Sequence, residues 1–156
     1  MPTKPQPTAK TTTRRAINAT LLAALIVVTM AIPKGHSQLF ESDSKRFGNS
    51  KMDIVVREIA RRPRASVLEI KINSVGSSVG SSFFLLCSIR QLAQLRGDYR
   101  YIVKLEETPK PHQMLVGFLQ GPEEPLANAG SEFARLNPRE TVIDLEQFAP
   151  ICDSMR

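Results

Sequence analysis

An alternating segment followed by an amphipathic one constrains the fold of this chain more than any other feature of its sequence. Residues 66–72 alternate apolar and charged side chains, which is the period-two pattern of a strand with one solvated face. Residues 83–96 place apolar side chains along one helical stripe and polar ones opposite, and Gly97 favours a helix end. The sequence therefore predicts a strand followed by one main amphipathic helix.

Two more strands are expected after this helix. Residues 99–106 alternate again, and residues 114–119 are apolar on both faces, which favours a central strand. The turn at 107–112 holds two prolines and predicts an antiparallel hairpin, whereas the strand–helix–strand order predicts a parallel pair with a right-handed crossover. The expected fold class is α+β, a small two-layer β-α-β-β sandwich with a mixed sheet and one main amphipathic helix.

The segments that flank this unit carry weaker patterns. Residues 52–60 have apolar side chains at helical spacing and predict a helix, although the same residues also suit a strand. Residues 125–136 suit a short helix. Asn137–Glu140 has the pattern of a helix cap with a first-turn proline, yet residues 141–145 have strand propensity, and we expect a fourth strand there.

The N-terminal segment has the composition of an export signal. A basic stretch without acids precedes twelve apolar residues at Leu21–Ile32, whereas a membrane-spanning helix needs about 20. The small residues Gly35 and Ser37 stand where signal peptidase requires them before a cut. We therefore expect a signal peptide at residues 1–37, cleaved before Gln38, with an uncleaved signal anchor as the alternative.

The rest of the chain is expected to form one domain behind this signal. Residues 38–51 mix Ser, Asp, Gly and Asn with charges and predict a flexible linker, so that a single α+β domain spans residues 52–156. No Cys lies near the cleavage region, which excludes lipid attachment to a new N-terminal Cys. The expected location is periplasmic or secreted or, with an uncleaved anchor, the inner membrane facing the periplasm.

The charge distribution argues against a nucleic-acid partner. The chain has 21 Lys and Arg and 15 Asp and Glu, for a net charge of +6. Five of the basic residues and none of the acidic ones lie in residues 1–37, so that 16 basic residues face 15 acidic ones in the remainder. The basic run from Arg57 to Arg64 lacks interleaved aromatic residues and predicts a solvated charged face. Contact with a membrane is expected only through an uncleaved N-terminal segment.

The two cysteines, Cys87 and Cys152, both lie in the part expected to be exported. An oxidising compartment lets an even pair form a disulfide. Closing a loop of this length contributes about 4 kcal/mol by the chain-entropy argument. We favour the disulfide; the alternative is a buried helix thiol at Cys87 and a free Cys152.

The segment Gly76–Gly80 matches the pattern G-x-S-x-G between a predicted strand and a predicted helix. Hydrolases expose a nucleophilic serine in that setting, which would be Ser78 here. His112, the one histidine beyond residue 37, would be the base, with Asp98, Glu106 or Glu107 as the acid that orients it. An α/β-hydrolase sheet needs far more chain than this domain offers, so a small serine hydrolase is kept as an alternative.

The same segment suggests two interpretations without catalysis. The N-terminus of a helix attracts anions, and the residues that would bind one are Gly76, Ser77, Ser78, Gly80 and Ser81. The segment lacks the lysine of a nucleotide-binding loop and the third spaced glycine of a dinucleotide fingerprint. The interpretation we favour is structural, in which Gly turns the chain and Ser78, Ser81 or Ser82 caps the helix.

No metal site, cofactor or enzyme is indicated by the remaining residues. One histidine and two distant cysteines make no spaced ligand set. The succession of strand, Ser/Gly turn, helix ending in Leu95–Tyr101, and apolar strand resembles small bacterial cell-envelope proteins, periplasmic or lipoprotein-like, of unknown function. The resemblance covers residues 66–120 and implies an envelope location and a small α+β module without catalytic residues. Many such proteins carry a lipid-attachment Cys, which this chain lacks.

The function we expect is therefore that of a non-enzymatic binding module exported to the bacterial envelope. Its partner would be another, unknown envelope protein, bound through the sheet face or an exposed strand edge. Tyr99, Tyr101 and Phe118 are the side chains expected to make that contact.

Overall fold

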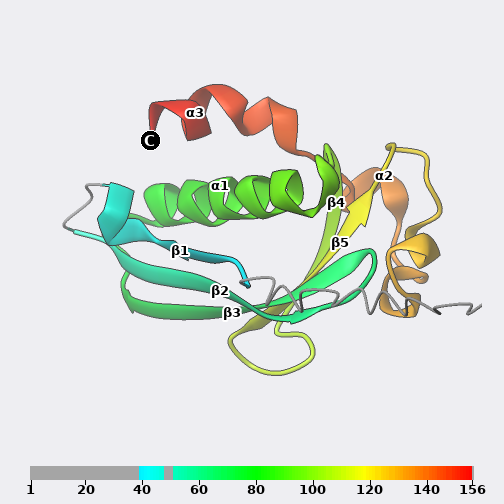
Figure 1. Ribbon diagram of the computed structural model, residues 1–156, viewed down its shortest axis with the longest axis horizontal. Helices are drawn as coiled ribbons and strands as arrows, with labels where there is room; N and C mark the ends of the chain where they lie inside the picture. The colour runs from blue at the N-terminus through cyan, green and yellow to red at the C-terminus, as the bar shows by residue number, and fades with distance from the viewer. Residues whose placement is uncertain (1–38, 48–50, 156) are drawn as a thin grey trace, which may run out of the picture. The chain divides into compact units, whose positions relative to one another are not determined.

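The computed structural model describes residues 39–47 and 51–155, and within them a six-stranded sheet is the main element (Figure 1). Its order is β1-β2-β3-β5-β4-β6, with every neighbouring pair antiparallel. The strands are β1 (Glu41–Asp43), β2 (Asp53–Arg61), β3 (Ala65–Ser74), β4 (Tyr101–Glu106), β5 (Gln113–Leu119) and β6 (Ile143–Asp144). The expected signal peptide at residues 1–37 and its cleavage site before Gln38 lie outside the described residues.

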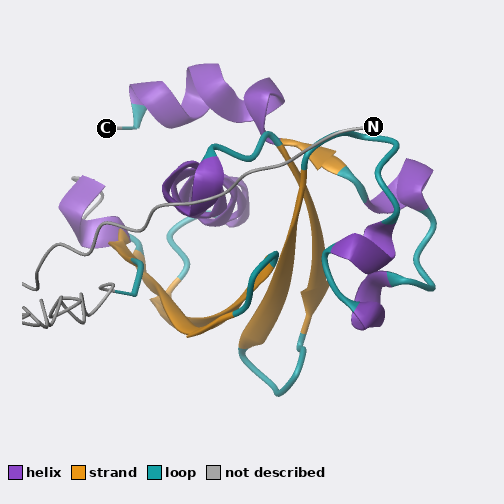
Figure 2. Cartoon of the chain, turned by 45° about the vertical axis from the view of Figure 1, so that its right-hand side comes forward, coloured by secondary structure: helices purple, strands orange, loops and turns teal. Residues whose placement is uncertain are grey.

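One long helix accompanies this sheet, together with short helical turns, so that the predicted α+β class is confirmed. The helices are α1 (Ser78–Gly97), α2 (Pro138–Thr141) and α3 (Ala149–Ser154), and the 3₁₀ turns are η1 (Ser44–Phe47), η2 (Leu126–Asn128), η3 (Ser131–Phe133) and η4 (Leu145–Phe148). In Figure 2 the strands β4 and β5 stand between α1 and the short turns that follow β5. No helix of the described residues is both long enough and apolar enough to cross a membrane.

The predicted mixed sheet with an adjacent parallel pair is wrong. Strand β5 lies between β3 and β4 and pairs antiparallel with both, as Ala65 opposite Gly117 and Tyr101 opposite Leu119 show. The predicted hairpin of β4 and β5 and the central position of β5 are confirmed. The physical reason is that β5 is apolar on both faces, so it takes the doubly buried place beside β3 that a parallel β4 would have held.

The helix predicted for residues 52–60 is wrong, because this segment is the strand β2. Met52, Ile54 and Val56 are buried at every second position, while the residues between them are more exposed. Strand β2 pairs along its length with β3. The alternating pattern therefore decides the structure here over the helical spacing of the same apolar residues.

The linker predicted for residues 38–51 is also wrong in the part that the structure describes. Strand β1 pairs with β2, with Glu41 opposite Arg57, and the side chain of Phe40 belongs to the hydrophobic core. The hydroxyl of Ser44 is buried, donates to the Met52 carbonyl at 3.0 Å and accepts from the Ile54 N–H at 2.9 Å. Polar residues in this segment thus make strand-edge contacts rather than a solvated tether.

Helix α1 begins earlier than the apolar stripe indicates. Ser77 is its N-cap, with the hydroxyl accepting a hydrogen bond from the Gly80 N–H at 3.1 Å. The cap expected at Ser78, Ser81 or Ser82 is therefore wrong, because these three serines already lie inside the first turns of the helix.

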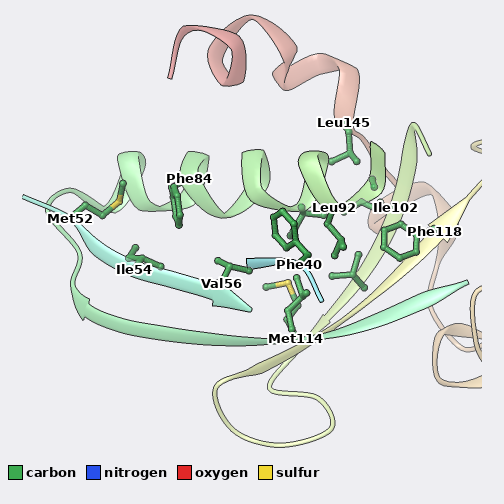
Figure 3. Packing of buried hydrophobic residues seen from close by; sticks show 14 residues of the cluster. Phe40, Met52, Ile54, Val56, Phe84, Leu92, Ile102, Met114, Phe118 and Leu145 are labelled. Carbon is green, nitrogen blue, oxygen red and sulfur yellow. The ribbon is translucent and has the colours of Figure 1, made fainter. Parts of the chain in front are cut away.

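The hydrophobic core lies between α1 and the sheet (Figure 3). Its largest buried side chains come from β2 through β5, from α1 and from η4, and include Phe84, Leu92, Ile102, Phe118 and Leu145. Each buried side chain of this kind contributes about 1.5–3 kcal/mol relative to an exposed one. Helix α1 is therefore held on the sheet by apolar burial along its length.

A second hydrophobic cluster covers the opposite face of β4 and β5, so the predicted two-layer sandwich does not describe the whole domain. Val103 and Leu115 belong to it, whereas their strand neighbours belong to the first cluster. Phe133 from η3 packs against them. A Cβ added at Gly117 would lie 2.7 Å from the Ala129 Cβ and 2.8 Å from the Phe133 ring, so only glycine lets this segment pack closely on β5.

The C-terminal predictions are confirmed in outline. Residues 125–136 form two 3₁₀ turns rather than one short helix. Asn137 caps α2 by accepting from the Arg139 N–H at 3.2 Å. The fourth strand expected at 141–145 is present but is only two residues long, and it pairs with the outer edge of β4.

The predicted disulfide between Cys87 and Cys152 is confirmed. It joins α1 to α3, with the two Cα atoms 5.2 Å apart and a sequence separation of 65. The C-terminal helix is therefore attached covalently to the helix that covers the sheet.

Candidate functional site: an apolar cleft beside a strand edge

An apolar cleft with a volume of about 270 Å³ opens between α1 and the β4 side of the sheet. Three residues form its polar rim, namely Ser82 of α1 and Lys104 and Glu106 of β4. We call it the α1–β4 cleft. Its apolar lining comes from α1, β5, β6 and η4 and consists of Leu85, Leu86, Ile89, Met114, Ile143 and Phe148.

A smaller hollow of about 160 Å³ adjoins the α1–β4 cleft and shares Leu85, Glu106 and Met114 with it. It extends the apolar surface toward Ile72 at the end of β3, which is 53% exposed, and toward His112 in the β4–β5 turn. The two hollows together give an apolar surface that runs along the N-terminal half of α1.

The cleft is open because the β4 side of the sheet does not follow α1 to its N-terminus, whereas β2 lies beneath that half of the helix and helps to bury Phe84 (Figure 3). Leu92, in the C-terminal half of α1, is fully buried, whereas Leu85 and Leu86 are only half-buried. Strand β6 could have covered this region, but it pairs only with Tyr101 and Ile102 of β4. Within the described residues no strand lies beyond the remainder of β4, so the apolar side chains of α1 face an opening.

The backbone of β4 faces this opening at alternate residues. The Leu145 N–H donates to the Arg100 carbonyl at 3.0 Å, so the backbone groups of Arg100 point toward the β6 side. Because the N–H and C=O of one residue point to the same side and successive residues alternate, the backbone groups of Lys104 and Glu106 point to that side as well.

The pairing of β5 gives the same orientation independently. The Phe118 N–H donates to the Arg64 carbonyl at 2.8 Å, so Phe118, and Val116 two residues before it, direct their backbone groups toward β3. Lys104 is paired opposite Val116. Its backbone groups therefore point away from β5, toward the uncovered edge.

The wall of the cleft that carries Ile143 and Phe148 is held in place by the C-terminal contacts. The disulfide joins α3 to α1. Arg90 of α1, only 8% exposed, donates to Glu146 at 3.2 Å and to Asp153 at 3.3 Å. The cleft therefore has one wall, α1, that belongs to the core and another that depends on these tethers.

The charges at the rim are partly neutralised within the chain. The ammonium of Lys104 is paired with the carboxylate of Glu106, whose side chain is 66% exposed. The Glu107 carboxylate accepts from the His112 N–H at 3.1 Å. Two adjacent acids against one lysine leave the open end of β4 with a negative balance.

The pairing of β6 with β4 includes an ion pair across the strands. The Arg100 guanidinium donates to both carboxylate oxygens of Asp144, at 2.9 and 2.7 Å. These hydrogen bonds hold the pKa of Asp144 below its usual value. At Tyr101 and Ile102 the edge of β4 is thus already paired with β6, which also places Asp144 beside Arg100.

A buried polar cluster occupies the other end of α1 and was not predicted from the sequence. The carboxylate of Glu58, fully buried, accepts from Ser66 at 2.7 Å, from Arg61 at 3.0 Å and from Arg96 at 3.1 Å. Burial by itself raises the pKa of Glu58, but the hydrogen bonds of Arg61, Ser66 and the Phe40 N–H outweigh it and lower the pKa to about 2. A carboxylate so fully paired has no free oxygen for catalysis and ties β2, β3 and α1 together.

Ser78 and His112, the residues of the hydrolase hypothesis, lie in different parts of the structure. Ser78 is the first residue of α1, whereas His112 lines the smaller hollow beside Glu106 and Glu107. Among the hydrogen bonds of the described residues, none joins Ser78 to His112. A catalytic role for Ser78 stays a prediction without a contact that supports it.

The anion-binding hypothesis concerns a segment whose serines serve the helix itself. Ser77 accepts from Gly80, and the hydroxyls of Ser81 and Ser82 both donate to the Ser78 carbonyl at 2.9 Å. The remaining residue of the set, Gly76, has a φ of 66° beside the Lys51 carbonyl, where glycine is favoured. These contacts describe a capped helix start and add no ligand-directed group to it.

The aromatic residues expected to contact a partner are placed differently from one another. Phe118 is fully buried, so the expectation that it contacts a partner is wrong. Tyr99 stacks on Phe118 at 5.4 Å and is covered by Arg64 at 5.1 Å. Tyr101 is half-buried beneath the guanidinium of Arg100, at 5.2 Å. These contacts make Tyr99 a part of the core edge.

The basic run is neutralised by four acids, three of which come from other parts of the chain. Four ion pairs join its arginines to carboxylates, namely Arg57–Glu41, Arg61–Glu58, Arg62–Glu132 and Arg64–Glu124. The run predicted as a solvated charged face therefore connects strands and loops. Among the described residues, no group of three His, Cys, Asp or Glu side chains could hold a metal ion.

Comparison of the chain with protein-family models, with curated proteins and with solved structures gave no match. The α1–β4 cleft was not predicted from the sequence either. The sequence signal that points to it is the apolar pair Leu85 and Leu86, two adjacent leucines near the start of the predicted helix.

Proposed function

We propose that this chain is an exported binding module of the bacterial cell envelope that binds its partner in the α1–β4 cleft and catalyses no reaction. The observation that carries the proposal is the cleft itself, about 270 Å³ of mainly apolar lining beside a sheet edge. Concave apolar sites with a few polar groups at the rim are where proteins most often bind their ligands.

The geometry favours binding over hydrolysis at this site. The rim offers Ser82, Lys104 and Glu106, and the hydroxyl of Ser82 donates to a backbone carbonyl while the two charged groups pair with each other. A nucleophile would need a base within hydrogen-bond reach. The hydrolase and anion-binding hypotheses gain no comparable observation.

Export is supported by the disulfide together with the sequence of residues 1–37. A structural disulfide persists in the periplasm and outside the cell, where thiols are oxidised. In this proposal residues 1–37 direct the chain across the inner membrane and are removed before Gln38, or remain as an anchor that leaves the domain in the periplasm.

Binding is tested with the purified protein and the apolar fluorescent probe 8-anilinonaphthalene-1-sulfonate. We expect saturable enhancement of its fluorescence by the wild type. The variant Ser82→Phe should lower the probe affinity at least fivefold, because Ser82 is exposed at the rim and an aromatic ring there fills the opening.

The matched control is Gln94→Phe. Gln94 is an exposed residue of the same helix and does not line the cleft, so the added ring leaves the cleft open and probe binding unchanged. Equal affinities of the wild type and both variants would remove the cleft as the binding site.

Export is tested by the intact mass of the protein recovered from a bacterial periplasm. Loss of residues 1–37, with both thiols blocked to alkylation until reduction, is the expected result. A full-length mass in the membrane fraction would support the anchored form, and a full-length protein in the cytoplasm would contradict export.

A further inference from the structure

We propose that the occupant of the α1–β4 cleft is an extended segment of a partner protein, which adds to the sheet as a strand along the uncovered edge of β4. This inference rests on the proposed binding function and specifies its partner. It is carried by a backbone edge and an apolar cleft that lie at the same place.

The edge offers hydrogen-bonding groups that only another backbone matches in spacing. The backbone groups of Lys104 and Glu106 point away from β5, and within the described residues β6 reaches no further than Ile102. The Thr108 hydroxyl donates to the Glu106 carbonyl at 3.0 Å. The Lys104 N–H, the Lys104 carbonyl and the Glu106 N–H therefore face the opening, and an apolar small molecule would leave all three without partners.

The edge and the cleft are joined through the same two residues. The side chains of Lys104 and Glu106 line the α1–β4 cleft, so a strand paired at these positions directs its own side chains of the same face over the apolar lining. The open stretch of β4, residues 103–106, spans about 13 Å at the rise of a strand. A segment of four to six extended residues fits it.

The pairing would continue one that the chain already makes. Strand β6 occupies the first two positions of this edge, and Asp144 places its carboxylate on Arg100. Toward Lys104 this pairing stops at Ile143, because the residues before it form α2, whose last turn closes with the Val142 N–H donating to the Pro138 carbonyl at 3.0 Å. An incoming strand extends the interface beyond Ile143, the first residue of β6.

The side chains of the partner segment follow from the surface it meets. At the position opposite Lys104 an apolar side chain would enter the cleft between Ile143 and Leu86. Beside the exposed acids Glu106 and Glu107, a Lys or Arg of the partner is complementary in charge. In a segment that runs antiparallel to β4, as β6 does, the residue opposite Glu106 precedes the residue opposite Lys104 by two positions. The proposed partner motif is therefore a basic residue followed two positions later by an apolar one, in an extended segment.

The test uses a fluorescein-labelled peptide of seven residues that alternates valine with threonine and carries one lysine, titrated against the purified protein by fluorescence anisotropy. A second peptide has the same side chains but is N-methylated at the alternate amides that would face β4. We expect the unmodified peptide to bind at least tenfold more tightly than the methylated one. Exchange of the Lys104 amide hydrogen should slow at least tenfold in the complex.

A proline substitution tests the same edge from the side of the protein. In Lys104→Pro the lost N–H is one that does not bond to β5, so the sheet is retained while the peptide affinity falls at least tenfold. The reference variant is Lys104→Thr, which loses the same side-chain charge but keeps the N–H, so Lys104→Pro should bind the peptide at least tenfold more weakly than Lys104→Thr.

Each outcome distinguishes this inference from the proposed function. Equal binding of both peptides, or binding of the apolar probe without either peptide, would overturn strand addition and leave the cleft as a binding site. Failure of peptides and probe alike would remove the proposed function as well. A concentration-dependent dimer in sedimentation that Lys104→Pro abolishes would assign the edge to a second copy of the chain instead.

Discussion

The two halves of α1 differ in how fully the sheet covers their leucine side chains. At the C-terminal half, Leu92 is fully buried and Arg96 reaches a carboxylate, Glu58, that is itself fully buried. At the N-terminal half, Leu85 and Leu86 are half-buried over an open cleft. The comparison teaches that one helix serves both as an anchor, at the buried Leu92 and Arg96, and as the wall of an open cleft, at the half-buried Leu85 and Leu86.

The largest expected loss of stability comes from a substitution that disrupts the contacts of the C-terminal half of α1. The substitution Glu58→Gln removes the charge that Arg61 and Arg96 contact and leaves Arg96 poorly compensated in a buried position. We expect the free energy of unfolding to fall by about 3–5 kcal/mol, as for other broken buried ion pairs. Denaturation by urea, followed by circular dichroism, measures it.

The control for this substitution is Glu69→Gln on β3. Glu69 lies 3.6 Å from Lys71 in a largely exposed pair, so its loss should change stability by less than about 1 kcal/mol. Similar losses for both variants would show that the buried cluster is not what anchors the helix.

The next largest effect concerns the tether of the C-terminal wall. The double substitution Cys87→Ser with Cys152→Ser opens a loop of 65 residues, and the chain-entropy argument gives a loss of about 4 kcal/mol. Hydrogen exchange should accelerate most in residues 143–154, which contact α1 through this bond and through Arg90. An even acceleration over the whole domain would contradict a local role for the disulfide.

A third prediction uses acid to separate the two halves. The pKa of Glu58 is lowered to about 2 in the folded protein, below the usual value of 4.5. The stability that it contributes is therefore complete above pH 4.5 and is lost as pH falls toward 2, by up to about 3 kcal/mol. Unfolding measured between pH 6 and pH 2 should show this loss in the wild type and a smaller one in Glu58→Gln; parallel curves would exclude Glu58 as its source.

The smallest effect on stability is expected at the open half. The substitution Leu86→Gln replaces a half-buried side chain of the cleft and should change stability by less than about 1 kcal/mol. The same change in the anchored half, Leu92→Gln, buries an amide without a partner and should cost at least about 3 kcal/mol. Thermal unfolding and probe binding, measured together, would sharpen the comparison: only Leu86→Gln should weaken binding without loss of fold.

The sequence predicted those elements whose patterns are local. The strand at 66–72, the helix α1 and the hairpin after it follow from spacing and composition. The predicted stripe of α1 is correct only in part, because Ser88 is buried whereas Leu85 and Leu86 are half-buried. The pairing of Cys87 with Cys152 was predicted from their even number and the expected compartment. The position of β5 between β3 and β4 does not follow from local patterns. It depends on whether β4 or β5, as the more apolar strand, pairs with β3.

The cleft is a further case in which local patterns do not suffice. It exists because β6 begins only at Ile143, opposite Ile102, and the residues before it form α2, so that the edge of β4 beyond Ile102 stays uncovered. The cap expected at Asn137 is present, but of the strand expected at 141–145 only Ile143 and Asp144 pair with β4, since Thr141 belongs to α2 and Leu145 to η4. The lengths of these neighbouring elements decide how much of β4 is covered. Glu58 was likewise counted among surface charges, since nothing near it in sequence shows that Arg96 will reach it from the helix.

The uncovered edge of β4 also bears on how the protein behaves at high concentration. An open edge strand is a template for aggregation into larger sheets. Here the open stretch is only residues 103–106, it carries the charged pair of Lys104 and Glu106, and the turn beyond it contains Pro109 and Pro111. Short length, edge charges and nearby prolines are the features by which natural sheets resist fibril growth, so this edge can accept one extended segment while giving a second sheet little to build on.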